Sequence, residues 1–284
     1  MSAEPSVGRQ SGHEPLPADH PGRDLPRTAN RPRRDLFGVP LDALTLGETV
    51  QLCMQAVDKG ELLEVGVVNA AKIVKMRNDA ALRDAVTGCD VIVADGQSVV
   101  WASRVLRRPL PERVAGIDLF QRLLYMAEVQ GRSVYFLGAR PEVLERMVER
   151  IRAQHPKLRI AGSQHGYYGD DEAPAVADAI KGSGADLLFL GMTSPKKEVF
   201  VATYGARTGA NVVHGVGGSF DVLAGVVKRA PRIWQRMGCE WLYRVLQEPR
   251  RLGGRYLTTN VAFVALVARE LARPSRPVPA GKDT

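Results

Sequence analysis

Apolar runs of strand length alternate with helical patterns along most of the chain from Leu36 onward. The helical stretches repeat apolar residues every three to four positions, whereas the strand-like runs are short and rich in Val, Ile and Leu. This alternation predicts βαβ units, and therefore a Rossmann-like, mostly parallel sheet with helices on both faces. The expected strands are residues 62–68, 91–94, 133–137, 158–161, 187–190 and 212–214, and the expected helices are residues 45–57, 71–86, 117–129, 142–153, 175–180 and 195–207.

One stretch, DVIVADGQSVVW from Asp90 to Trp101, organises the rest of the pattern. Its apolar run does not alternate with polar residues, which is typical of a strand buried on both faces. Ligands of open α/β sheets bind outside the carboxyl ends of the strands, so Asp95 lies where chemistry is expected. Aspartate is also a favoured N-cap, and the pattern alone leaves capping of the following helix open as the alternative.

The pattern changes after Gly225. Residues 228–255 carry seven arginines and one lysine against two glutamates, interleaved with large apolar and aromatic residues at helical spacing. Such a basic amphipathic element suits a membrane interface or closure over a diphosphate, and arginine favours forked contacts with phosphate. A terminal helix that packs its apolar stripe on the sheet and leaves its arginines in water is the alternative. Residues 257–271 are apolar but too short to span a membrane.

The composition fits one large α/β domain with additions, because 284 residues at 45% hydrophobic content can bury a full core. Three well-separated cysteines support neither a disulfide framework nor a thiolate metal site. Neither a leader peptide nor a spanning segment is recognised, so we expect a cytoplasmic location. The net charge of +8 indicates an anionic partner.

The expected organisation has four parts. Residues 1–34 are a disordered N-terminal arm, rich in Pro, Ser, Gly and Arg, whose basic end is either solvated or in contact with lipid phosphate. Residues 35–227 form the Rossmann-like catalytic domain, residues 228–273 a basic amphipathic helical segment that we call the C-terminal appendage, and residues 274–284 a disordered tail.

Several turns at predicted strand ends are candidates for phosphate binding. Glycines let backbone N–H groups approach an anion closely, although the turn at residues 215–219 does not fit the dinucleotide fingerprint. Residues 138–141 form a similar strand-to-helix turn, and neither turn is a strong signal by itself. Lys196 and Lys197 follow Pro195, a residue suited to the first position of a helix. Two lysines at a helix N-terminus oppose the helix dipole, which suggests a bound anion, and a solvated pair of lysines is the alternative. No metal site and no cofactor are expected, because no DxD pair and no histidine ligand spacing occur.

Ordered motifs across the chain resemble the WecG/TagA/CpsF glycosyltransferase family, also called glycosyltransferase family 26. The matching segments are VNA from Val68, ADG from Ala94, PERVAGIDL from Pro111, VYFLGARPEV from Val134, GSQHGYY from Gly162, SPKKE from Ser194, GVGGSFDVLAGVVKRAP from Gly215 and EWLYRVLQEPRR from Glu240.

The resemblance implies an inverting, metal-independent transfer of a sugar from a UDP donor to a polyprenyl-diphosphate-linked saccharide at the inner face of the plasma membrane, in cell-surface polysaccharide synthesis. It implies that Asp95 is the general base and that appendage arginines complete the site over the diphosphate. Two departures, Val67 where the family often has Thr and Lys197 where it often has Gln, leave the donor sugar open between N-acetylmannosamine, glucose and glucuronic acid types.

The expected site and partners follow. Substrate contacts are expected from Asn69, Arg113, Gly138, Lys196, Lys197, Gly215, Gly217, Gly218 and Asp221, and diphosphate or membrane contacts from Arg229, Arg232, Arg236, Arg244, Arg251 and Arg255. An anionic membrane surface is expected as a partner and nucleic acid is not, and relatives suggest self-association away from the membrane. An NAD(P)-dependent oxidoreductase on a similar fold and a basic nucleic-acid-binding protein are the alternatives.

Overall fold

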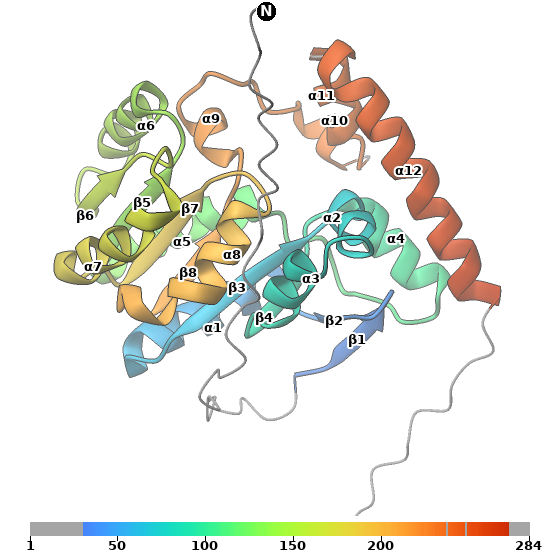
Figure 1. The fold of residues 1–284 in the computed structure, drawn as a ribbon, viewed down its shortest axis with the longest axis horizontal. Coiled ribbons are helices and arrows are strands. Elements are labelled where there is room, and N and C mark those ends of the chain that lie inside the picture. The colour runs from blue at the N-terminus through green and yellow to red at the C-terminus, as the bar shows by residue number, and fades with distance from the viewer. Residues whose placement is uncertain (1–30, 237, 248, 273–284) are drawn as a thin grey trace, which may run out of the picture.

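The computed structural model describes residues 31–236, 238–247 and 249–272, and its centre is a six-stranded sheet (Figure 1). Every pairing in this sheet is parallel, which confirms the predicted Rossmann-like class. The carboxyl ends of all six strands therefore lie at one edge. The strands are β3 (Leu63–Val68), β4 (Val91–Ala94), β5 (Ser133–Gly138), β6 (Arg159–Gln164), β7 (Leu187–Gly191) and β8 (Val212–Gly215), in the order β4-β3-β8-β7-β5-β6.

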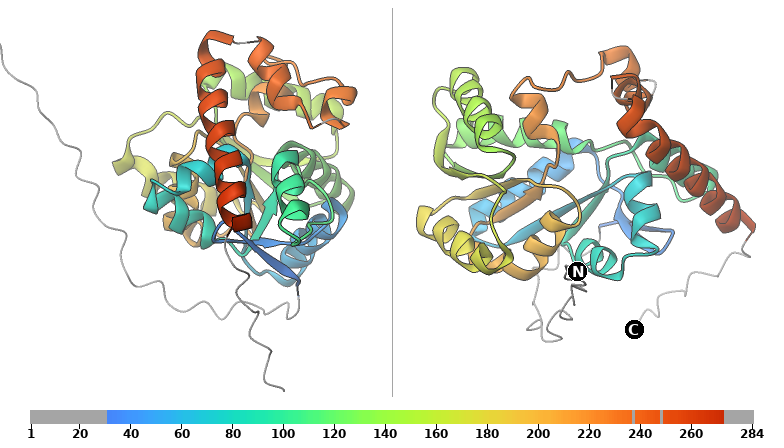
Figure 2. Two further views of the ribbon diagram at one scale, coloured as in Figure 1. Left: turned by 90° about the vertical axis from the view of Figure 1, so that its right-hand side faces the viewer. Right: turned by 45° about the horizontal axis from the view of Figure 1, so that its top comes forward.

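Helices cover both faces of this sheet (Figures 1 and 2). The largest apolar cluster packs α1, α5 and α6 on one face, and two further clusters pack α7 with α8 and α2 with α3 on the other. The helices are α1 (Leu46–Lys59), α2 (Ala70–Met76), α3 (Ala80–Thr87), α4 (Gln97–Val105), α5 (Gly116–Gln130), α6 (Pro141–Gln154), α7 (Ala173–Ser183), α8 (Lys196–Tyr204) and α9 (Ser219–Leu223), with short 3-10 turns at Asp170–Glu172 and Ala206–Thr208.

The prediction of a single helix over residues 71–86 is wrong. Two helices, α2 and α3, occupy this stretch, because Asp79 stops the apolar helical pattern and begins a new helix. Its backbone is extended, and its side chain accepts a hydrogen bond from Leu82 N at 2.9 Å. Aspartate side chains offer the backbone this alternative to a continuous helix.

A small antiparallel hairpin, β1 (Arg33–Leu36) and β2 (Val39–Asp42), precedes the sheet, and sequence analysis did not predict it. The buried carboxylate of Asp42 binds Arg33 Nε at 3.0 Å, and the guanidinium groups of Arg31 and Arg33 both donate to Asp90 O. Two arginines of the segment predicted as the arm thus contact an internal carboxylate and a backbone carbonyl. Residues 1–30 of the arm, like the tail 274–284, lie outside the described residues.

The described part of the chain ends in three helices, α10 (Arg232–Arg236), α11 (Glu240–Gln247) and α12 (Pro249–Ala272). Figures 1 and 2 show α12 running along α2, and the buried residues Phe263 and Leu266 hold it there. The ring of Phe263 meets that of Phe37 edge-on at 5.3 Å, next to the hairpin turn. None of the helices in the described part of the chain combines the length and apolar character that crossing a bilayer requires.

Candidate active site

Asp95 lies at the carboxyl edge of the sheet, directly after β4. Its backbone N–H continues the pairing with β3 by donating to Val68 O at 2.9 Å. The carboxylate does not cap the following helix α4, whose N-cap is Gly96. Instead, Asp95 Oδ1 accepts a hydrogen bond from Gly116 N at 3.1 Å, at the start of α5. The capping alternative for α4 is thus not adopted, and Asp95 is fixed by an element 21 residues away.

The surroundings of Asp95 act on its pKa in both directions. Burial raises the pKa of this carboxyl group most strongly, and the neighbouring Glu240 adds to the rise. The Gly116 N–H, Arg113 and Lys72 lower it, and the pKa remains above its ordinary value. A carboxyl group with a raised pKa binds a proton more readily than an exposed one, which suits a general base.

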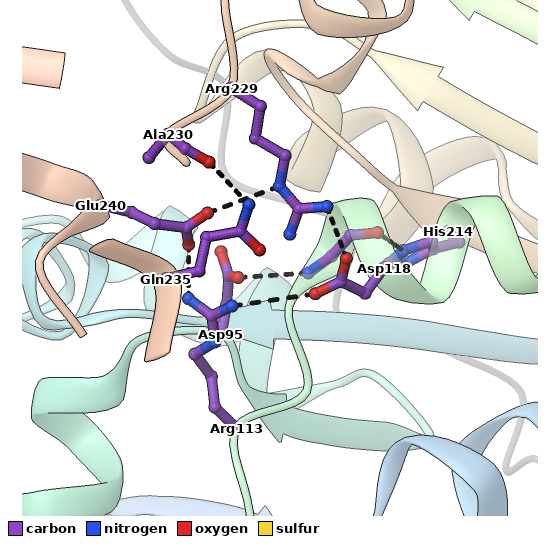
Figure 3. Close-up of polar contacts among 9 residues, drawn as sticks. Asp95, Arg113, Asp118, His214, Arg229, Ala230, Gln235 and Glu240 are labelled. Atoms are coloured by element: carbon purple, nitrogen blue, oxygen red, sulfur yellow. Dashed lines mark hydrogen bonds and ion pairs between the residues drawn. The ribbon is translucent and has the colours of Figure 1, made fainter. Parts of the chain in front are cut away.

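Two arginines and two carboxylates form a closed ring of ion pairs next to Asp95 (Figure 3). We call Arg113, Asp118, Arg229 and Glu240 the charge ring. Arg229 Nη1 lies 2.7 Å from Asp118 Oδ1, and Arg113 Nη2 lies 3.7 Å from Asp118 Oδ2. Glu240 closes the ring, because its carboxylate contacts Arg113 Nη1 and lies 3.4 Å from Arg229 Nε. The appendage thereby reaches the edge of the sheet where Asp95 lies.

His214 of β8 supports the backbone that holds Asp95 (Figure 3). The imidazole is fully buried, and its Nε2 lies 3.2 Å from Gly116 O. Burial lowers the pKa of His214 to about 4, so the imidazole is uncharged at neutral pH. Both backbone polar groups of Gly116 are therefore engaged: its N–H donates to the Asp95 carboxylate, and its carbonyl oxygen contacts His214 Nε2.

A second buried ionic cluster joins α2 to α8. Lys72 Nζ and Lys197 Nζ lie 2.9 and 2.8 Å from Glu198 Oε1. The pKa of Glu198 is lowered to about 2, since the two lysines outweigh the opposing effect of burial. Lys72 Nζ also donates to Val67 O at 2.6 Å. The cluster therefore reaches β3 at the strand end nearest Asp95.

The two lysines of the SPKKE turn are both satisfied by protein groups in this arrangement. Lys197 pairs with Glu198, whereas Lys196 donates to the carbonyl oxygens of Gly166 at 3.2 Å and Tyr168 at 2.9 Å. Pro195 precedes α8 and is its N-cap, so the first helical residue is Lys196 and not Pro195 as expected. Anion binding by this pair stays a prediction.

The glycines expected to bind phosphate have packing roles. A Cβ on Gly138 would lie 2.5 Å from the backbone of Gly191, because the ends of β5 and β7 approach closely there. A Cβ on Gly215 would lie 3.1 Å from the side chain of Lys197, so this glycine leaves room for the buried lysine stem. Contact of these glycines with a phosphate remains a prediction.

The rest of the glycine-rich turn leads into α9. Gly217 has a positive φ of 53°, a backbone conformation that favours glycine. Gly218 is the N-cap of α9, and Asp221 lies in the first turn of this helix. The backbone carbonyl of Asp221 accepts hydrogen bonds from Val226 N at 2.9 Å and Val227 N at 3.2 Å, which turns the chain toward the appendage.

Asn69 follows β3 as Asp95 follows β4, and the two turns touch. The Asn69 side chain caps α2 by accepting from Lys72 N at 3.0 Å. A Cβ on Gly96 would lie 3.3 Å from the Asn69 Cβ, so the Asp95-Gly96 turn packs directly against Asn69. The structure thus places Asn69, Asp95, Arg113 and Arg229 in one region.

The other predicted appendage residues are placed by backbone only. Arg232 and Arg236 belong to α10, Arg244 to α11, and Arg251 and Arg255 to α12, and their side chains lie outside the described residues. Sequence analysis missed the partners that complete the site. In the sequence pattern Lys72 is only part of a predicted helix, Glu240 only begins the EWLYRVLQEPRR segment, and His214 only ends a predicted strand. The further residues not predicted are Asp118 and Glu198.

The fold defines an α/β protein with a six-stranded parallel sheet, and the candidate site lies at the carboxyl edge of that sheet. The model of the glycosyl transferase WecG/TagA/CpsF family matches residues 34–277, so the chain belongs to that family. It is a glycosyltransferase of cell-surface polysaccharide synthesis, and the family implies a nucleotide-sugar donor and a lipid-linked acceptor. The family assignment decides against the oxidoreductase and nucleic-acid-binding alternatives. Among the described residues, no three His, Cys, Asp or Glu side chains are grouped as a metal site would require.

Proposed function

We propose that this enzyme transfers a hexose-type sugar from a UDP donor to a polyprenyl-diphosphate-linked saccharide, with inversion at the anomeric carbon. The observation that carries the proposal is the position of Asp95. Its carboxylate is partly buried at the carboxyl edge of the sheet, its pKa is raised, and a ring containing two guanidinium groups lies beside it. A carboxylate and two guanidinium groups thus lie together, which is the combination that a general base and a leaving diphosphate require.

Asp95 is the proposed general base. It takes the proton of the acceptor hydroxyl while that oxygen forms a bond to the anomeric carbon and the bond from this carbon to the UDP oxygen breaks. Attack from the face opposite UDP inverts the configuration. Positioned proton transfer of this kind contributes roughly 10²–10⁴-fold to rate. The hydrogen bond from Gly116 N keeps the carboxylate in place at 3.1 Å.

The leaving diphosphate is neutralised by arginines in this proposal, without a metal ion. Arg113 and Arg229 are already held at the site, and guanidinium groups bind phosphate oxygens in pairs. The arginines of α10 to α12 add positive charge from the same segment of chain. Charge stabilisation by fixed donors is usually a large part of catalysis.

The appendage also offers a surface for the membrane that carries the acceptor. The outer side of α12 exposes a stripe of apolar residues at helical spacing, although the helix is docked through Phe263 on its other side. An apolar stripe in a segment rich in arginine suits the interface of an anionic bilayer. We therefore propose peripheral attachment to the inner face of the plasma membrane. The stripe consists of Leu257, Val261, Val264 and Leu271.

A UDP-release assay across a panel of UDP-sugars, with a short-chain prenyl-diphosphate sugar as acceptor, tests the reaction. We expect acceptor-dependent UDP release with at least one donor of the N-acetylmannosamine, glucose or glucuronic acid type, unchanged by EDTA. NMR of the product should show an anomeric configuration opposite to that of the donor. Retention of configuration, or release from every donor without acceptor, would contradict the proposal.

Vesicle sedimentation tests the membrane surface. The double substitution Val261→Asp and Val264→Asp should reduce binding to anionic vesicles, because it places two charges in the apolar stripe. Val129→Asp on α5 is the matched control, since Val129 is 62% exposed and Val261 63%. Equal binding by all three proteins would refute this surface.

A further inference from the structure

The charge ring contains one carboxylate from the core and one from the appendage. Asp118 belongs to α5, which packs in the main apolar cluster, and it contacts both Arg113 and Arg229. Glu240 is the first residue of α11 and contacts the same two arginines from the opposite side. Asp118 can therefore hold both guanidinium groups in position when Glu240 leaves.

The charge ring also contains a hydrogen-bond donor that has no acceptor among the described residues. Arg229 Nη2 is buried and finds no hydrogen-bond acceptor among the described residues. A buried donor without an acceptor is costly, which indicates that a group with further oxygen atoms belongs there. The Glu240 carboxylate has two oxygens, which lie against Arg113 Nη1 and near Arg229 Nε. A diphosphate has more oxygens and more negative charge than the carboxylate.

We propose that Glu240 occupies the diphosphate subsite of the substrate-free enzyme, and that the diphosphate of the nucleotide-sugar donor displaces it from Arg113 and Arg229. The inference rests on the proposed function for the identity of the anion. Glu240 then has two effects. It holds α11 over Asp95 while no donor is bound, and it competes with the donor for the same guanidinium groups.

Isothermal titration of the full chain with UDP, and separately with inorganic pyrophosphate, tests the competition. Glu240→Gln keeps the size of the side chain and removes its charge, so both ligands should bind roughly tenfold more tightly, a gain of ~1.4 kcal/mol. Glu240→Asp keeps the charge but shortens the reach to the two arginines. It should also tighten binding, and it serves as the second variant if the amide destabilises α11.

Two controls separate displacement from general effects. Asp118→Asn removes the same charge from the same ring but also the group that aligns the arginines, so it should not tighten binding. Glu270→Gln weakens another ion pair of the appendage, with Arg108 at 3.1 Å, and should leave affinity unchanged. Unchanged or weaker binding in both Glu240 variants, or equal tightening by Asp118→Asn, would overturn the proposal.

The readouts also separate this inference from the proposed reaction. Tighter pyrophosphate binding in the Glu240 variants without turnover of any UDP-sugar would support the subsite and refute the reaction. Turnover of a UDP-sugar by the wild type with no gain in affinity in either variant would refute the role of Glu240 alone.

Discussion

The buried imidazole of His214 makes folding stability depend on pH. Burial lowers the pKa of His214 from 6.5 to about 4, so between these values the unfolded chain binds a proton that the folded chain does not. Its contribution is fully present above pH 6.5 and is lost as the pH falls toward 4. The linkage relation gives a loss of about 2 kcal/mol between pH 7.5 and pH 5.

Other groups with shifted pKa values do not obscure the effect of His214 between pH 7.5 and pH 5. The pKa of Glu198 falls from 4.5 to about 2, so its contribution is lost only below pH 4.5. The raised pKa of Asp95 acts in the opposite direction, because protonation of this partly buried carboxyl group favours the folded state as the pH falls. Comparison with a variant that lacks only the imidazole cancels both effects.

Urea unfolding of the wild type and of His214→Gln, at several values between pH 7.5 and pH 5, provides the measurement. Glutamine keeps an N–H donor for Gly116 O but does not titrate. We expect the free energy of unfolding of the wild type to fall by about 2 kcal/mol more than that of the variant over this interval. Parallel pH dependences would show that His214 is not buried as described.

Three further substitutions and one control, Leu257→Ala, test the packing that supports the site. Phe263→Ala should loosen α12 and cost about 3 kcal/mol, whereas Leu257→Ala on its exposed side should cost under ~0.5 kcal/mol, as measured by urea unfolding and by tryptic release of the C-terminal helix. Glu198→Gln leaves two buried lysines without their carboxylate, so we expect a loss of about 3 kcal/mol in urea unfolding. Gly191→Ala places a Cβ 2.2 Å from the ring of Phe220, and the melting temperature should fall.

The sequence predicts the sheet well because its strands are buried on both faces. Each of the six expected strands overlaps a strand of the structure, and β4 covers residues 91–94 as expected. The hairpin β1–β2 was missed because its strands are short and carry arginines that resemble a solvated arm. Those arginines bind Asp42 and Asp90 O, contacts that a one-dimensional pattern does not contain.

The position of Asp95 was predictable for the same reason, since an unbroken apolar run ends there. Its partners were not. Only the fold brings Gly116 and His214 to the region of Asp95, because no sequence spacing links them to it. Glu240 lies 145 residues after Asp95 in the sequence. For the lysine pair, anion binding stays a prediction, and the structure adds a partner that the pattern does not reveal, because Glu198 Oε1 lies 2.8 Å from Lys197 Nζ.

The turnover of Asp95→Asn tests the central claim most directly. Asparagine still offers an oxygen to Gly116 N, so α5 keeps its start while the base is lost. The account predicts a kcat lower by roughly 10²–10⁴-fold, with UDP affinity retained. A kcat close to that of the wild type would contradict the assignment of Asp95 as the base.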